Sequence, residues 1–196
     1  MAAQGLSELA VLVLAAGKGE RVGGPKALLM IDGEPLAALH RKRAPNGARV
    51  IVVTRASIAR ALERFDLSLV ISDEPDALGP AGSIRAAVQA GALDDAERVL
   101  VTPVDVPPSP PERLGPLLDA LEQSDAARWD RGHPIAIRAS VLRERYATEA
   151  PILRDVLRSL GDRCARLVGN PCGPTDLDTP EDVLRLTGAL PRFFGV

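Results

Sequence analysis

Four short apolar runs, each rich in Val, Ile and Leu, most constrain how this chain can fold. They lie at 10–15, 49–54, 67–72 and 98–104, and each is nearly continuous rather than alternating with polar residues. A strand has this pattern when both of its faces are buried, which is typical of parallel sheets covered by helices. The runs therefore predict a mostly parallel sheet at the centre of the fold.

Helix-like segments separate these runs and continue after them. The first four lie at 35–44, 57–65, 81–91 and 111–124, with Ser57 as a candidate N-cap and Gly91 as a candidate C-terminal stop. After residue 125 we expect a strand at 133–138, a helix at 150–161, a short strand at 164–169 and a last helix at 179–190, capped by Thr179. Strands alternating with helices predict one α/β domain over 1–196 with a doubly wound, Rossmann-like sheet.

Composition excludes several classes of protein. The 196 residues are enough for one domain with a core, and 46% of them are hydrophobic. The net charge of −2 argues against wholesale binding to nucleic acid or to an anionic membrane. No apolar run reaches the roughly 20 residues of a membrane span, and the N-terminus lacks the basic segment of a signal peptide. We expect a cytoplasmic protein with neither nucleic-acid nor membrane partners.

The first apolar run leads directly into the loop "LAAGKGERVGGPKALL" at 14–29. Its glycines allow backbone amides to approach an anion closely, and Lys18, Arg21 and Lys26 add positive charge. Ligands of open α/β sheets bind beyond the carboxyl ends of the strands, where this loop lies. Asp105 ends the fourth run, and the segment "DLDTPED" precedes the last helix. The loop therefore predicts a cradle for a triphosphate.

Two commoner phosphate motifs fit this loop poorly. Gly19 and Gly24 have the glycine spacing of a P-loop, but Pro25 and Lys26 follow where Lys and Ser or Thr are required. The glycines at 17, 19 and 23 are one residue too widely spaced for the dinucleotide fingerprint. A merely flexible turn explains the glycines and leaves the cations unexplained.

The segment "LAAGKGERVGGPK" closely resembles the opening signature of the sugar-nucleotide and cofactor nucleotidyltransferases. Later segments resemble, in order, the molybdenum cofactor nucleotidyltransferases of the MobA/MocA-like NTP transferase family: "GPAGSIRAAV", "PVDVP", "RGHPIAI", "SLGDRCAR" and "DLDTPEDV". The G-H-P and G-D-x-x-A-R stretches are more similar to the cytidylyltransferase branch than to the guanylyltransferase branch. The resemblance spans nearly the whole chain and implies the nucleotide-diphospho-sugar transferase fold.

The resemblance also implies roles for individual residues. Arg21, Lys26 and Asp105 would be catalytic, with Arg21 facing the β- and γ-phosphates and Lys26 the α-phosphate. His133 and Asp162 would bind the acceptor, and Asp105 with Asp178 would bind Mg²⁺. The nucleotide-binding residues that it implies are Leu14, Ala15, Ala16, Gly17, Lys18, Gly19, Arg21, Lys26, Gly82, Ser83 and Asp105.

The implied reaction moves an NMP group from an NTP, with CTP favoured over GTP, to a phosphorylated acceptor such as molybdopterin, and it releases pyrophosphate. Such transfer depends on positioning and on charge neutralisation. Mg²⁺ favours one or two carboxylates with phosphate oxygens and water, so we expect the carboxylates of Asp105 and Asp178 roughly 4–7 Å apart. Two alternatives stay open: a sugar-1-phosphate nucleotidyltransferase, and a non-catalytic nucleotide-binding accessory protein for molybdoenzyme maturation. A molybdoenzyme is also left open as a protein partner.

Overall fold

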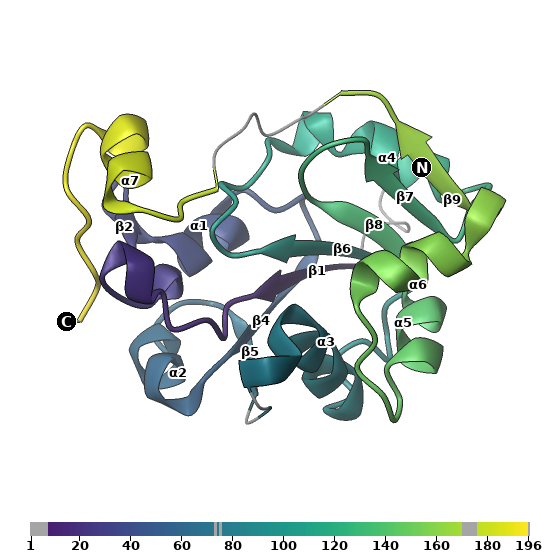
Figure 1. Cartoon of the computed structure of the whole chain (residues 1–196), viewed down its shortest axis with the longest axis horizontal. Coiled ribbons are helices and arrows are strands. Elements are labelled where there is room, and N and C mark those ends of the chain that lie inside the picture. Colours follow the sequence, from purple (N-terminus) through teal and green to yellow (C-terminus); the bar gives the residue numbers. More distant parts are fainter. Residues whose placement is uncertain (1–7, 73, 75, 170–175, 196) are drawn as a thin grey trace.

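The centre of the protein is a seven-stranded sheet in the order β5-β4-β1-β6-β8-β7-β9 (Figure 1). The computed structural model describes residues 8–72, 74, 76–169 and 176–195. The strands of the sheet are β1 (Leu9–Leu14), β4 (Arg49–Thr54), β5 (Ser68–Ile71), β6 (Arg98–Pro103), β7 (Ala126–Trp129), β8 (Ile135–Arg138) and β9 (Cys164–Leu167). Only β8 runs antiparallel to its neighbours in this sheet, which confirms the predicted mostly parallel arrangement.

β1 lies between β4 and β6, and the order of the strands reverses at this point. The chain first moves outward from β1 to β4 and β5, and it then returns to the other side of β1 as β6. Leu12 of β1 pairs with Ile51 on one side and with Val101 on the other. In open α/β sheets, the crevice at such a reversal holds the ligand. The loops that follow β1 and β6 therefore border the crevice where a ligand is expected.

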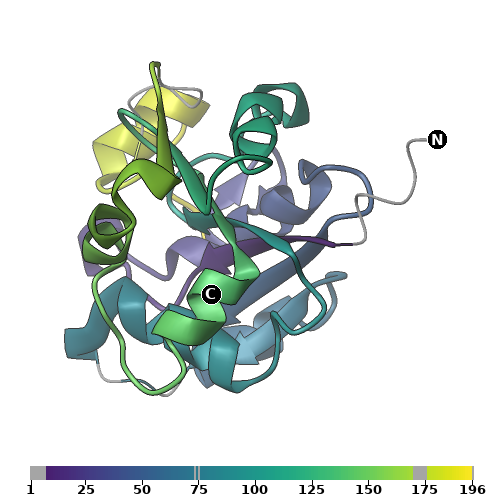
Figure 2. The same ribbon diagram turned by 90° about the vertical axis from the view of Figure 1, so that its right-hand side faces the viewer.

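Helices cover both faces of the sheet (Figure 2). Val11 and Val13 of β1 belong to a core with α1, α2 and α4, whereas Ala10 and Leu12 belong to a second core with α3, α5 and α6. This burial on both faces is the reason that the strand sequences are continuously apolar. The helices are α1 (Leu36–Lys42), α2 (Ala56–Leu62), α3 (Gly79–Gln89), α4 (Gly115–Ala120), α5 (Ala139–Arg145), α6 (Leu153–Ser159) and α7 (Pro180–Thr187).

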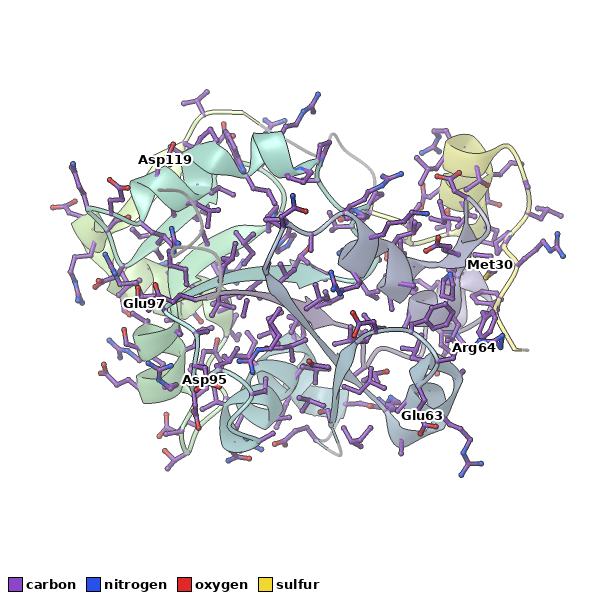
Figure 3. The ribbon with its side chains drawn as sticks, turned by 180° about the vertical axis from the view of Figure 1, so that it is seen from behind. Met30, Glu63, Arg64, Asp95, Glu97 and Asp119 are labelled. Carbon is purple, nitrogen blue, oxygen red and sulfur yellow. The ribbon has the colours of Figure 1, made fainter. Side chains whose placement is uncertain are left out.

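The C-terminal segment packs beneath the glycine loop. The amide of Met30 donates to the carbonyl of Arg192, and the amide of Phe194 donates to the carbonyl of Leu28, at 2.7 and 2.8 Å. From behind, Arg64 and Met30 lie at this end of the molecule (Figure 3), and the Arg64 guanidinium is 4.7 Å from the centre of the Phe194 ring. The segment therefore braces the short 3-10 helix η2 (Lys26–Leu28) and β2 (Met30–Ile31), which pairs with β3 (Glu34–Pro35).

Several details of the sequence-based prediction were wrong. The N-cap of α2 is Arg55, and Ser57 lies inside the helix. The single helix expected at 111–124 is a short 3-10 helix, η4 (Pro111–Arg113), followed by α4, because Pro116 has no amide to continue a helix from 111. β7 and α5 were missed, since β7 has no β-branched side chain and α5 begins at Ala139, directly after β8, with no turn residue to mark its start. No helix in the described ranges is long and apolar enough to cross a membrane.

α7 begins with the cap that the sequence predicted. The Thr179 hydroxyl accepts a hydrogen bond from the Asp182 amide at 3.2 Å, and the Asp182 carboxylate accepts one from the Thr179 amide at 2.9 Å. The same carboxylate also accepts a hydrogen bond from the amide of Asp178 at 3.2 Å. These bonds fix the position of the backbone at Asp178, whose side chain lies in the site described below.

Replacing Thr179 by alanine is expected to lower the free energy of unfolding by about 1 kcal/mol, because the cap bond to the first turn is lost. For a chain of this size, this corresponds to a fall of about 2–4 °C in the Tm, measured by thermal denaturation. Glu181→Gln is the matched control, since Glu181 lies in the same turn outside the capping box. A Tm for Thr179→Ala equal to that of the control would show that the cap contributes nothing.

Candidate active site

The glycine loop after β1 folds back on itself. The Gly19 carbonyl accepts hydrogen bonds from the amides of Val22, Gly23 and Gly24, at 3.0, 3.1 and 3.1 Å. Gly19 has a φ of +66°, and a Cβ there would lie 1.9 Å from the Gly24 oxygen, so only glycine fits. The amides of residues 22–24 are thus used inside the loop. Those of residues 17–19 donate to no backbone carbonyl in the described part of the chain, and they remain available to an anion.

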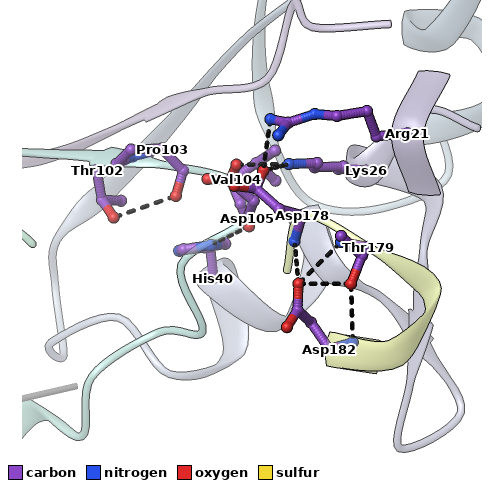
Figure 4. A network of polar contacts seen from close by, with 10 residues as sticks. All are labelled: Arg21, Lys26, His40, Thr102, Pro103, Val104, Asp105, Asp178, Thr179 and Asp182. Carbon is purple, nitrogen blue, oxygen red and sulfur yellow. Dashed lines mark hydrogen bonds and ion pairs between the residues drawn. The ribbon is translucent and has the colours of Figure 1, made fainter. Parts of the chain in front are cut away.

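Lys26 joins the two acidic residues that the sequence placed at this edge of the sheet (Figure 4). Its Nζ donates to Asp105 Oδ2 at 2.8 Å and to Asp178 Oδ1 at 2.6 Å. Because both oxygens contact one nitrogen, they cannot be farther apart than these two distances together. The structure therefore brings the carboxylates of Asp105 and Asp178 together, with a positive charge between them.

The charges of this cluster stabilise one another. Burial lowers the pKa of Lys26, but the hydrogen bonds and negative charges of Asp105 and Asp178 outweigh this effect and raise it above its ordinary value. The hydrogen bond from Lys26 lowers the pKa of Asp178 despite partial burial. Arg21 adds a second cation, with its Nη2 3.1 Å from Asp178 Oδ1 at the exposed side. Lys26 and Asp178 are both charged at neutral pH.

Backbone contacts hold the two acidic residues in place. Asp105 lies in a tight turn after β6, which closes by a hydrogen bond from the Val106 amide to the Pro103 carbonyl at 3.3 Å. The Asp105 carbonyl in turn accepts a hydrogen bond from the Leu177 amide at 3.0 Å. This bond connects the turn directly to the residue before Asp178, although the two acidic residues are far apart in the sequence.

A cavity of about 500 Å³ opens beside this cluster. It is lined by nine of the eleven residues that the sequence assigned to the nucleotide, namely Leu14, Ala16, Gly17, Lys18, Gly19, Arg21, Lys26, Ser83 and Asp105. Ala15 is buried behind the lining, where its amide donates to the Val53 carbonyl at 2.8 Å. Gly82 is a packing residue, because a Cβ there would lie 3.0 Å from the Cβ atoms of Glu74 and Leu78.

Four charged residues of this cavity, Glu20, Arg55, Glu74 and Asp76, were missed by sequence reasoning. Arg55 donates from Nε to the Ala16 carbonyl at 2.6 Å and forms an ion pair with Asp76. Asp76 also pairs with Lys18 at 2.9 Å, and Glu74 pairs with Arg85 deeper in the wall. Arg55 directly follows β4, so the rule that pointed to Asp105, a polar residue at the carboxyl end of a buried strand, would have found it.

The charged side chains that line the cavity balance in number. Four are cationic and four anionic: Lys18, Arg21, Lys26 and Arg55 against Glu20, Glu74, Asp76 and Asp105. A triphosphate brings several negative charges of its own. The side chains that line the cavity therefore do not by themselves neutralise such a ligand, and a further cation beside it would contribute to neutralisation.

A second cavity of about 650 Å³ adjoins the first, with Leu14, Pro80 and Pro103 in the walls of both. Its lining combines Trp129, Leu153 and Leu157 with four arginines, Arg128, Arg154, Arg158 and Arg166, whereas Asp130 is its one acidic side chain in the described ranges. His133 lies in this cavity, and burial lowers its pKa although Asp176 and Asp105 act in the opposite direction. Asp162 is exposed on the 3-10 helix η5 (Gly161–Arg163) and lines neither cavity.

The fold and the site define a nucleotide-binding α/β protein, with a basic, glycine-rich loop and two acidic residues at the reversal of its strand order. Residues 11–164 match the model of the MobA-like NTP transferase domain. The chain belongs to this family and is a nucleotidyltransferase.

Individual relatives agree with this assignment. The chain is 32% identical over 183 residues to a molybdenum cofactor guanylyltransferase of Rhodobacter capsulatus, covering 90% of this chain and 94% of the relative. It is also 32% identical to the enzyme of the same name from Pseudomonas fluorescens strain SBW25, covering 90% and 86%. A Mycobacterium tuberculosis structure, crystallised in complex with manganese, superposes with a TM-score of 0.70 at 23% identity, covering 94% of this chain and all of the other (100%). The fold is thus the Rossmann-like fold of the nucleotide-diphospho-sugar transferases.

Proposed function

We propose that this protein transfers an NMP group from an NTP to a phosphorylated, molybdopterin-type acceptor in molybdenum cofactor biosynthesis. The observation that carries the proposal is Lys26, whose ammonium lies between Asp105 and Asp178 at the edge of a cavity large enough for a nucleotide. The names of the curated relatives support the acceptor and the pathway.

The second cavity supports an anionic acceptor with a flat apolar part. Its arginines exceed its acidic side chains, and Trp129 with the leucines of α6 supplies an apolar surface. Because the two cavities share Leu14 and Pro103, an acceptor phosphate in one can approach a nucleotide phosphate in the other. In this proposal the arginines hold the anionic groups of the acceptor, and His133 lies beside them. Asp162 is the weaker of the two acceptor residues that the sequence suggested, since it lines neither cavity.

A divalent metal ion fits the donor set of this site. Carboxylates from two segments, Asp105 and Asp178, face a single point, and Lys26 already places a cation there. The balanced charge of the side chains that line the first cavity also favours a further cation beside a triphosphate. Asp105 and Asp178 would hold the ion, which would neutralise phosphate oxygens, and Mg²⁺ is the ion we propose because it favours few carboxylates together with phosphate oxygens. The manganese in the structure of the mycobacterial neighbour is in keeping with this.

The residues of this chain would act by binding and orientation. A phosphate oxygen of the acceptor forms a bond to the α-phosphorus, while the bond from that phosphorus to the bridging oxygen breaks and pyrophosphate leaves with the electron pair. A phosphomonoester is already ionised near neutral pH, so no strong base is needed. Lys26 is positioned to neutralise charge on the α-phosphate, Arg21 to hold the terminal phosphates, and the amides of 17–19 to bind phosphate oxygens.

Release of pyrophosphate tests the proposal. Purified protein with an NTP, Mg²⁺ and a molybdopterin-type acceptor should release pyrophosphate, and a sugar 1-phosphate in place of that acceptor should not support release. Turnover with the sugar phosphate instead would make the protein a sugar-nucleotide enzyme. Nucleotide binding without pyrophosphate release from any acceptor would favour the non-catalytic accessory protein.

The choice of base is a separate prediction. The sequence motifs favoured CTP, whereas the curated relatives that match 90% of this chain at 32% identity carry the name guanylyltransferase. We therefore expect calorimetric titration with Mg²⁺ to give tighter binding of GTP than of CTP, by roughly tenfold or more, since hydrogen bonds that one base can satisfy and the other cannot discriminate strongly. Tighter binding of CTP than of GTP would contradict this prediction and would assign the protein to the cytidylyltransferase branch.

A further inference from the structure

His40 is a buried histidine that the proposed mechanism does not use. It lies on α1, is 3% exposed, and has its Nε2 3.2 Å from the carbonyl oxygen of Val104 (Figure 4). A carbonyl oxygen only accepts, so the ring proton is on Nε2 and His40 is the donor. Burial lowers the pKa of His40 to about 4, which the bond to Val104 and the charge of Asp105 only partly oppose. The ring is therefore a neutral donor near pH 7.

The carbonyl that His40 holds belongs to the centre of the turn after β6. Val104 and Asp105 are the two central residues of this turn, which the hydrogen bond from Val106 to Pro103 closes. The peptide between the central residues is the one whose rotation distinguishes type I from type II turns. A hydrogen bond to the Val104 carbonyl therefore fixes the orientation of that peptide.

This orientation decides where the acidic cluster can form. Rotating the central peptide to the type II arrangement would require a positive φ at Asp105, which Asp105 does not have. Asp105 contacts Lys26 through its carboxylate, and through its carbonyl it accepts the amide of Leu177, next to Asp178. One hydrogen bond from α1 thus holds the turn that carries Asp105 and that is bonded to the residue before Asp178.

We propose that His40 is a positioning residue, which holds the 104–105 peptide so that the carboxylates of Asp105 and Asp178 converge. The inference rests on the proposed function, because it takes these two carboxylates to be the groups that act. His40 itself does not line the nucleotide cavity. Its effect is exerted through the turn, as outer-shell hydrogen bonds tune the residues that contact a ligand.

Four variants test the proposal. His40→Leu removes the donor and keeps an apolar side chain, whereas His40→Gln keeps an N–H donor at a similar distance along the side chain. His40→Asn has the same donor on a shorter side chain. Leu39→Ala is the matched control, because Leu39 is also 3% exposed on α1 and has no hydrogen bond to the turn. For each we would measure kcat and KM for pyrophosphate release, the Tm, and binding of Mn²⁺ in the presence of nucleotide by calorimetry.

His40→Leu is expected to lower kcat and the affinity for Mn²⁺ by about 10–100-fold, with little change in nucleotide binding in EDTA. His40→Gln should keep most of the wild-type kcat and Mn²⁺ affinity, and His40→Asn should not. Leu39→Ala should lower the Tm while keeping kcat and Mn²⁺ binding.

A folded His40→Leu protein with the kcat and Mn²⁺ affinity of the wild type would overturn the proposal, and so would an equal loss in Leu39→Ala. If His40→Leu does not fold, the comparison of His40→Gln with His40→Asn replaces it. Equal activity of these two variants would count against the proposal. Asp105→Asn, measured in parallel, tests the role of the carboxylate separately from the positioning role of His40. Full activity of Asp105→Asn would refute the role of Asp105 on which this inference rests, whereas absence of pyrophosphate release from the wild-type protein would refute the proposed function. Inactivity of Asp105→Asn together with normal His40 variants would refute only the positioning role.

Discussion

Lys26→Ala is expected to lower kcat/KM by about 10²–10³-fold or more, because a preorganised charge at the reacting phosphate is lost. The variant should still fold, since Lys26 lies on a short 3-10 helix at the rim of the cavity rather than in either core. Removing the ammonium also leaves the carboxylates of Asp105 and Asp178 facing each other without a cation. Two such carboxylates repel and raise the pKa of one of them.

This second consequence gives a measurement besides activity. Without the competing ammonium, Mn²⁺ should bind to Lys26→Ala more tightly in the absence of nucleotide than it binds to the wild type. Lys42→Ala is the control, because Lys42, at the end of α1, pairs with Glu34 of β3 at 2.7 Å and lies outside both cavities. Turnover of Lys26→Ala near the wild-type rate would remove Lys26 from the mechanism.

Asp105→Asn should lower kcat/KM more than Asp178→Asn does. We expect about a 10²–10³-fold loss of kcat/KM for the first variant and about tenfold for the second. The side chain of Asp105 is 24% exposed and that of Asp178 is 36% exposed. Asp178 also forms an ion pair with the exposed Arg21. The charge lost at Asp178 is therefore better screened by solvent.

The ranking is read from steady-state kinetics at saturating acceptor, with Asp66→Asn as the control. Asp66 pairs with Arg41 but is 90% exposed and remote from both cavities, so its replacement should change nothing. An equal loss in Asp105→Asn and Asp178→Asn would refute the ranking and would indicate that both carboxylates act as a single unit.

The sheet was predictable because the local pattern and the tertiary environment agree. The strands at 9–14, 49–54 and 98–103 are buried on both faces, and this burial appears in the sequence as continuous apolar runs. β7 and α5 lie at the side of the sheet where β8 reverses direction, and neither carries a clear pattern, because β7 has no β-branched side chain and α5 follows β8 without a turn residue. Their formation depends on pairing with β8 and β9 and on packing against the sheet.

The loop chemistry was also readable from the sequence. The cations at 18, 21 and 26 are given by residue type alone, and glycine at position 19 permits the positive φ that the structure has there. The predicted cap at Thr179 is equally local, since its partners are within four residues. Local hydrogen bonds and backbone sterics do not depend on the rest of the fold, and they are therefore specified by neighbouring residues.

Only the tertiary structure decided which of these side chains meet. Lys26 contacts acidic residues 79 and 152 positions away, His40 reaches the turn at 104, and Arg55 closes on Asp76. Asp162, which the sequence grouped with His133, lies on an exposed turn outside both cavities. Pairing over such distances depends on strand order and on the course of the loops, and these are set by packing of the whole sheet rather than by any short segment. The sequence alone thus determined the strands, the loop and the type of chemistry, whereas the fold determined the partners of each charge.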